Sequence, residues 1–165
     1  MKLFTKYHSS PVGNLKIQCT HEQVLLIHFV EEIGLENDNS ELLEKCIIQL
    51  DEYFSGKRKN FDLPLGQTGS AFQMNVWDHL LKIPYGKTIS YLQLSKQIGD
   101  VKAIRAIAAA NGKNNLAIVV PCHRVIGSDA KLVGYAGGLW RKKWLLEHET
   151  KIHTGVEQLN LLDNY

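Results

Sequence analysis

The sequence predicts an α/β fold in its first part and a mostly helical fold, built around a helix-turn-helix, in its second part. Apolar, β-branched segments separated by turn residues fill positions 2–30, as in strands. Two Ser-x-x-Gln capping boxes, which open helices, follow position 69. Residues 1–69 hold 7 Lys or Arg against 10 Asp or Glu, whereas residues 70–150 hold 11 against 5. We therefore expect a small structural domain with a linker over 1–69, a basic helix-turn-helix domain suited to a polyanionic partner over 70–150, and a tail over 151–165.

The first part predicts three strands and one helix. Residues 2–8 and 14–20 form two strands around a Pro-Val-Gly-Asn turn, and residues 24–30 form a third, more apolar strand. Ser40 is a typical N-cap, and apolar residues at helical spacing predict a helix over 41–54. Residues 57–68 are irregular and have the composition of a linker.

The second part predicts four helices. Ser70 opens a helix that stops before Pro84, and Ser90 opens a second that Gly99 closes. A third begins near residue 101 and ends by residue 112, so the tight turn between the second and third predicts a helix-turn-helix. The Ala-rich third helix is equally compatible with DNA contact and with packing. A final helix over 139–149 is expected to expose its three basic residues, Arg141, Lys142 and Lys143.

The composition indicates a soluble protein of a reducing compartment. The chain has 165 residues, of which 44% are hydrophobic and 22% charged, as in ordinary globular proteins. Three cysteines do not make a disulfide framework. The N-terminus does not resemble a signal peptide, and no apolar run approaches the roughly 20 residues of a membrane helix. We expect a cytoplasmic protein with no membrane contact.

Cys122 is the candidate nucleophile. It follows the apolar run 116–120, which predicts a buried strand that stops at Pro121, and a side chain just past such a strand is held rigidly. The neighbouring His123 and Arg124 are cationic groups that would favour the thiolate. In extended chain neighbouring side chains point to opposite faces, so a bridging water and direct contact with His123 are both open. The other two cysteines, Cys19 and Cys46, are typical of small core residues.

The segment Pro121–Val125 resembles the active-site signature of the O6-alkylguanine-DNA alkyltransferases, which move an alkyl group from guanine in DNA onto their own cysteine. The resemblance covers about residues 70–149, in family order and spacing, and is weak before Ser70. It implies a ribonuclease H-like first domain and a winged-helix-like second domain, over 70–150, that binds DNA and contains the active site. The other segments that carry it are Ile83–Tyr91, Ala103–Asn114, Val133–Leu139 and Leu145–Glu149.

This resemblance implies a role for each of five catalytic residues. Cys122 attacks the alkyl carbon, His123 removes its proton through a water, and Glu149 holds and polarises the imidazole. A base is needed because a thiol with a pKa near ~8.5 is only slightly ionised at neutral pH. Asn114 organises the loop beside the histidine. The Tyr91 hydroxyl donates to the departing guanine, which lowers the barrier.

The resemblance also implies how substrate is bound. The Ala136 N–H donates to guanine O6, the carbonyls of Cys122 and Val125 accept from the exocyclic amine, and Tyr135 walls the pocket. The third helix lies in the minor groove, where small side chains permit close approach. Arg105 takes the place of the flipped base, since a planar guanidinium can stack and bond at once. The implied small-residue DNA contacts are Ala106, Ala109 and Ala110.

Two departures from the family pattern affect secondary features. Some members bind zinc in the first domain, but Cys19, His21 and His28 do not make a four-ligand set here. Ala130 stands where the family often has glycine, which leaves that turn open. We expect no metal and no cofactor, a monomer, and double-stranded DNA containing O6-alkylguanine as the partner. Activity on O4-alkylthymine is left open.

Two other functions are compatible with parts of this pattern. A lesion-binding protein without transfer activity would share the helix-turn-helix, but non-repairing relatives carry tryptophan where this chain has Cys122. A Cys-His hydrolase would share the nucleophile, but nothing in the sequence indicates an acyl substrate. Transfer of label from alkylated DNA to the protein separates all three.

Overall fold

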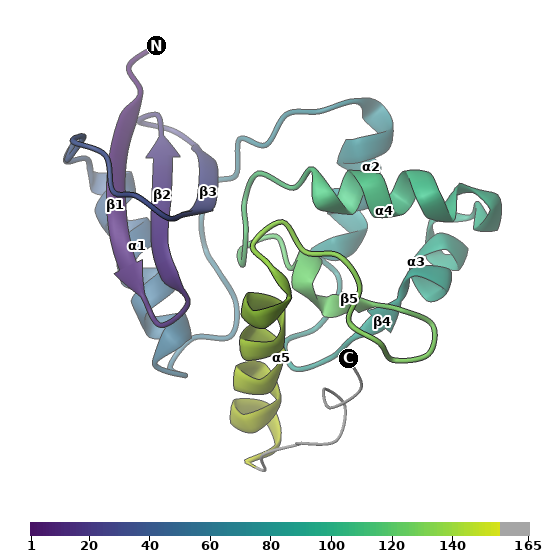
Figure 1. The fold of residues 1–165 in the computed structure, drawn as a ribbon. Coiled ribbons are helices and arrows are strands. Elements are labelled where there is room, and N and C mark those ends of the chain that lie inside the picture. Colours follow the sequence, from purple (N-terminus) through teal and green to yellow (C-terminus); the bar gives the residue numbers. More distant parts are fainter. Residues whose placement is uncertain (156–165) are drawn as a thin grey trace. The chain divides into compact units, whose positions relative to one another are not determined.

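The computed structural model describes residues 1–155, which form two compact units (Figure 1). The first unit contains residues 1–68 and 115–119, and the second contains residues 69–114 and 120–155. The predicted tail begins inside a helix, and its residues 156–165 lie outside the described residues.

The first unit is a three-stranded antiparallel sheet with one helix packed against it (Figure 1). The strands β1 (Phe4–Ser10), β2 (Gly13–Cys19) and β3 (Val24–Val30) lie in sequence order, close to their predicted positions. The helix α1 (Glu41–Phe54) has the predicted bounds, and the Ser40 side chain accepts from the Leu43 N–H as its cap. Alternate strand residues and the apolar stripe of α1 form the core, which includes Leu15, Ile17, Ile27, Leu43 and Leu50.

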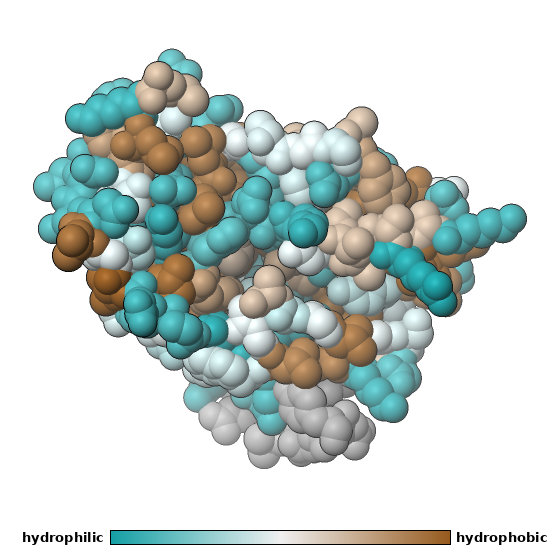
Figure 2. Space-filling view, turned by 45° about the horizontal axis from the view of Figure 1, so that its top comes forward, coloured by the Kyte–Doolittle hydropathy of each residue, from teal (hydrophilic) through white to brown (hydrophobic). Residues whose placement is uncertain are grey.

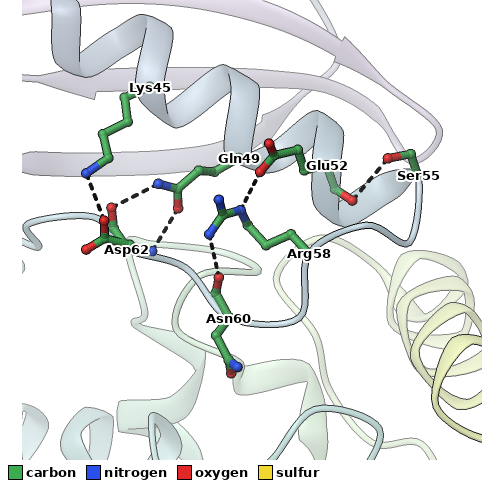
Figure 3. Close-up of polar contacts among 7 residues, drawn as sticks. All are labelled: Lys45, Gln49, Glu52, Ser55, Arg58, Asn60 and Asp62. Carbon is green, nitrogen blue, oxygen red and sulfur yellow. Dashed lines mark hydrogen bonds and ion pairs between the residues drawn. The ribbon is translucent and has the colours of Figure 1, made fainter.

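The irregular segment 57–68 is fastened to α1 and to the sheet rather than free (Figure 3). The buried Gln49 side chain donates to the Asp62 carbonyl at 2.9 Å and accepts from the Asp62 N–H at 2.8 Å. Arg58 Nε donates to Glu52 at 2.6 Å. The Val24 N–H donates to the Pro64 carbonyl at 2.8 Å. The Gln49 side chain on α1 thus makes the hydrogen bonds that the Asp62 backbone, which lies outside any strand, would otherwise lack.

The expected strand over 116–120 is not present, although its residues are buried as predicted. Leu116 makes only a single bridge to Ile27, in which the Ile27 N–H donates to the Asn115 carbonyl and the Ala117 N–H donates to the Ile27 carbonyl. Ile118 then has a φ of 72°, in the left-handed region that a β-branched residue rarely adopts. This backbone turn interrupts the extended conformation that the apolar run suggested.

The second unit is mostly helical (Figure 1). The helices α2 (Ala71–Leu80) and α3 (Tyr91–Ile98) each open with the predicted capping box, at Ser70 and Ser90. Gly99 closes α3 in the left-handed conformation, with a φ of 94°. A 3₁₀ turn η1 (Val101–Ala103) leads into α4 (Ile104–Gly112). A second 3₁₀ turn, η2, covers Cys122–Arg124, and the short strands β4 (Ile89–Ser90) and β5 (Val125–Ile126) pair in parallel.

The last helix, α5 (Leu139–Thr154), is longer than predicted, and its basic residues are not all exposed. Arg141 and Lys142 are buried, whereas Trp140 is 54% exposed. The prediction is wrong because both cations turn toward backbone carbonyls of the preceding segments; Arg141, for example, donates to the Gly137 carbonyl at 2.8 Å. Within residues 1–155 no helix has the length and apolar character needed to cross a membrane.

Candidate active site

Cys122 lies in the 3₁₀ turn η2, not at a strand end, and is only 6% exposed. Its N–H donates to the Val120 carbonyl at 2.8 Å, and the Arg124 N–H donates to the Pro121 carbonyl at 3.0 Å. Proline fixes φ at the entrance to this turn. The tight backbone therefore holds the thiol in one place, as the sequence suggested, but by a different local structure.

His123, Arg124 and Glu149 form one buried network. Glu149 Oε1 lies 2.7 Å from His123 Nε2 and accepts from an Arg124 terminal nitrogen at 3.0 Å. Arg124 Nε donates to Glu149 Oε2 at 2.9 Å, and its other terminal nitrogen donates to the Ile83 carbonyl at 2.7 Å. The Gly86 N–H also reaches Glu149 Oε2, at 3.2 Å. The pairing of His123 with Glu149 agrees with the role that the resemblance implied.

Hydrogen bonds and charge in this network keep the carboxylate ionised, whereas burial keeps the imidazole neutral. Burial alone would raise the pKa of Glu149, but the His123 ring and the Arg124 guanidinium overcome it, and the pKa is held well below its usual range. Burial lowers the pKa of His123 despite the neighbouring Glu149. A neutral imidazole can accept a proton. Its second nitrogen, Nδ1, is buried and makes no hydrogen bond within residues 1–155.

The sequence suggested that Arg124 favours the thiolate of its neighbour Cys122, but the structure gives Arg124 other partners. Its guanidinium is committed to Glu149 and to the Ile83 carbonyl. Burial raises the pKa of the Cys122 thiol, while the Asn114 side chain and the Lys142 ammonium act in the opposite direction. The cation that favours the thiolate is therefore Lys142, from α5.

Lys142 is a candidate functional residue that the sequence reasoning missed. Its side chain is fully buried, and Nζ donates to the carbonyls of Val125 at 2.6 Å, Val133 at 3.0 Å and Gly134 at 3.3 Å. Burial lowers its pKa to about 8, so it still carries its charge at neutral pH. A signal was available, because Lys142 stands three, four and seven residues before Leu145, Leu146 and Glu149, on the buried stripe of the helix.

The pocket residues implied by the resemblance all belong to the second unit. Asn114 donates to the Val120 carbonyl at 2.8 Å. This bond links the two ends of the irregular segment 114–120, which precedes Cys122. Burial raises the pKa of Tyr91, so its hydroxyl keeps its proton. Burial likewise raises the pKa of Tyr135, which lies in the Gly-rich loop beside the exposed Ala136.

Asn111 is a second residue that the sequence reasoning did not single out. It lies at the end of α4 and is 4% exposed. Its Nδ2 lies 3.1 Å from the Tyr91 hydroxyl oxygen and 3.4 Å from the Cys122 carbonyl oxygen. Its side chain therefore bridges Tyr91, the predicted hydrogen-bond donor, and the backbone of the nucleophile Cys122.

The face of α4 predicted to contact DNA is partly exposed. Arg105, Ala106 and Ala109 are exposed, but Ala110 is buried and its carbonyl accepts from Trp77 Nε1 at 2.9 Å. Ala110 thus packs within the second unit, and its contact with DNA stays a prediction. Figure 2 shows small, mildly hydrophobic side chains in pale brown in the region of α4, next to hydrophilic ones. The exposed lysines on and around the helix-turn-helix are Lys96, Lys102 and Lys113.

The structure shows what replaces the family pattern at Ala130 and around Cys19. Ala130 has a φ of 62°, the conformation for which glycine is favoured, so the turn is kept without the glycine. In the first unit Cys19 is buried, and its sulfur lies 3.5 Å from the Ser40 hydroxyl. Among residues 1–155 no group of three or more His, Cys, Asp or Glu side chains is placed to hold a metal ion.

Comparisons with known proteins identify the family. Residues 3–67 match the ribonuclease-like domain of 6-O-methylguanine DNA methyltransferase, and residues 71–151 match its DNA-binding domain. The chain is 41% identical to a methylated-DNA–protein-cysteine methyltransferase of Methanosarcina acetivorans, over 85% of this chain and 94% of that protein. It is 42% identical to the protein of that name from Mycobacterium leprae, over 93% and 95%. A crystal structure of Mycobacterium tuberculosis OGT in complex with DNA is similar with a TM-score of 0.84 and 39% identity, over 90% of this chain and 94% of that one. The chain belongs to the 6-O-methylguanine DNA methyltransferase family.

Proposed function

We propose that this protein repairs O6-alkylguanine in double-stranded DNA by moving the alkyl group onto Cys122. One observation carries the proposal. Cys122 and His123 lie next to each other in one buried 3₁₀ turn, and the His123 ring is held at 2.7 Å by the ionised Glu149. This is the arrangement of nucleophile, base and orienting acid. Family membership supports the same reaction.

The reaction balances without a cofactor. The Cys122 thiol gives its proton through a water to the neutral His123, and the thiolate sulfur attacks the alkyl carbon. A C–S bond forms as the C–O6 bond breaks, and the electron pair of that bond stays with guanine. The guanine anion then takes a proton from water, and His123 releases to water the proton that it received from Cys122. Since a thioether has no leaving group comparable to guanine, the protein is not regenerated and acts once.

The residues around the leaving base stabilise its developing charge. The Tyr91 hydroxyl, which burial keeps protonated, donates to a ring nitrogen, and the Ala136 N–H donates to O6. The carbonyls of Cys122 and Val125 accept from the exocyclic amine. Lys142 already donates to the Val125 carbonyl, whose second lone pair is available to the base. Tyr135 forms a wall of this pocket.

The second unit carries both the chemistry and DNA binding, and the first unit has a structural role. The exposed face of α4 lies in the minor groove, and Arg105 replaces the extruded nucleotide in the stack. The protein acts as a monomer, because one copy of the second unit contains every residue of the proposed site.

The test is a stoichiometric transfer assay. The protein is incubated with excess duplex DNA that contains O6-methylguanine labelled in the methyl group, and the product is digested for mass spectrometry. We expect one methyl group per protein molecule, on Cys122, and none on Cys19 or Cys46. Cys122→Ser should bind the DNA and take up no label. Multiple turnovers, or label on another cysteine, would exclude the proposal, and binding without transfer would indicate a lesion-binding protein.

A further inference from the structure

Asn111 occupies a position that packing alone does not explain. The residue is buried near the end of α4, where the carbonyl of its neighbour Ala110 accepts from Trp77. Its carboxamide oxygen is buried and has no hydrogen-bond partner within residues 1–155. A buried, unpaired carbonyl oxygen lowers stability, so an apolar residue of the same size would suit the core better.

The contacts of the carboxamide nitrogen fix how the group is turned. Nδ2 lies 3.4 Å from the Cys122 carbonyl oxygen, which can only accept. Turning the amide over would place two acceptor oxygens against each other, so the NH₂ group must face Cys122. The same nitrogen lies 3.1 Å from the Tyr91 hydroxyl oxygen. Because NH₂ only donates, the Tyr91 oxygen is the acceptor in this bond.

From this geometry we propose that Asn111 is a positioning residue, which by donating to the Tyr91 oxygen directs the hydroxyl proton of Tyr91 toward the leaving guanine. A phenolic hydroxyl that accepts one hydrogen bond still has its own proton to give. With the Asn111 side occupied by N–H, that proton points away from α4. The inference rests on the proposed function, because it assigns Asn111 a part in the same displacement.

Two substitutions test the direction of this hydrogen bond. Asn111→Leu removes the donor and keeps the approximate volume. Asn111→Asp keeps the shape but offers only acceptor oxygens, so it would draw the Tyr91 proton toward itself. Transfer is measured in single turnover with O6-methylguanine duplex DNA over a range of protein concentrations. We expect the limiting rate to fall about 10-fold for Asn111→Leu and further for Asn111→Asp, because Asn111 only directs a proton donor whose full contribution is about 10²–10⁴-fold. The half-saturating concentration should not change.

The double variant shows whether Asn111 acts through Tyr91. In a Tyr91→Phe background, Asn111→Leu should cause little further loss, because the hydroxyl that it directs is already absent. Alkylation of Cys122 by iodoacetamide, which has no guanine to protonate, should proceed at the wild-type rate in both Asn111 variants. The thermal midpoint of Asn111→Leu should equal or exceed that of the wild type.

The outcomes separate this inference from the proposed function. If wild-type protein transfers the methyl group and Asn111→Leu does so equally fast, the inference is wrong and the proposed function stands. Equal losses in methyl transfer and in iodoacetamide alkylation would mean that Asn111 acts on Cys122 instead of Tyr91, which also overturns the inference. If wild-type protein transfers no methyl group, the proposed function itself fails.

Discussion

At the scale of single residues, Glu149 is the group on which most of the site depends. It is 1% exposed and receives hydrogen bonds from Arg124 and from the Gly86 N–H, besides its contact with His123. A buried ion pair contributes little net stability, but removing one partner leaves the other charge buried and uncompensated. Glu149 therefore fixes the orientation of His123 and also neutralises Arg124.

We expect Glu149→Gln to lower the free energy of unfolding at pH 7 by about 3–5 kcal/mol, because Arg124 loses its counter-charge. Methyl transfer should slow as well, since the imidazole loses the carboxylate that orients it. The measurement is urea unfolding of the wild type and the variant, with single-turnover transfer under stable conditions. Glu147→Gln, on the same helix and in an exposed ion pair with Lys143 at 3.9 Å, is the control and should change stability by no more than about 0.5 kcal/mol.

The difference in unfolding free energy between the wild type and Glu149→Gln should depend on pH in a definite direction. The pKa of Glu149 in the folded protein lies below the value of about 4.3 in unfolded chains. Its stabilising contribution is therefore fully present above that value and is lost as pH falls toward the folded-state pKa. The stability gap between wild type and Glu149→Gln should be constant from pH 6 to 7 and shrink below about pH 4. A gap that widens in acid would contradict the assigned ionisation state.

At the scale of elements, local sequence signals predicted where the helices begin, whereas contacts between distant residues determined the backbone of the 116–120 segment. Ser40, Ser70 and Ser90 each cap a helix through a hydrogen bond to a backbone N–H three residues ahead, so sequence alone locates these starts. The 116–120 segment depends instead on Ile27, far away in the chain, and no local pattern reveals a φ of 72° at Ile118.

The same distinction applies to the candidate site. Cys122, His123 and Glu149 could be predicted because a short motif and its flanks carry the family resemblance. Lys142 and Asn111 were missed because their importance lies in tertiary contacts to backbone carbonyls and to Tyr91. A lysine and an asparagine on helices are ordinarily solvated surface residues.

The exposed Arg105 on α4 gives a prediction for that helix. Arg105→Ala should slow transfer from duplex DNA about 10- to 100-fold, since base extrusion costs a few kcal/mol, and should leave transfer from free O6-benzylguanine nearly unchanged. The measurement is the second-order rate constant on each substrate. Arg105→Lys should rescue only partly, because an ammonium cannot stack as a plane. Equal losses on both substrates would mean that Arg105 supports the fold or the pocket.

At the scale of the whole molecule, the charge excess of the second unit is smaller at the surface than the sequence suggests. Arg124, Arg141 and Lys142 are buried and bind internal acceptors, so they are unavailable to a polyanion. The exposed cations of the helix-turn-helix region are those that can contact phosphates, which are Lys96, Lys102, Arg105 and Lys113. Electrostatic binding to DNA should therefore depend on a few identifiable side chains.

Salt dependence measures how many of these cations contact the backbone of DNA. In the Cys122→Ser background, which we expect to bind without reacting, the logarithm of the DNA affinity should fall linearly with the logarithm of salt concentration, because protein cations release counterions from the DNA. Replacing Lys96, Lys102 and Lys113 together by glutamine should reduce the slope by about 0.9 for each lysine that contacts a phosphate. Lys57→Gln, an exposed lysine of the first unit, is the matched control and should leave the slope unchanged. If the triple variant kept the wild-type slope while Lys57→Gln reduced it, the DNA-binding surface would have to be assigned to the first unit, and the proposed role of α4 would be lost.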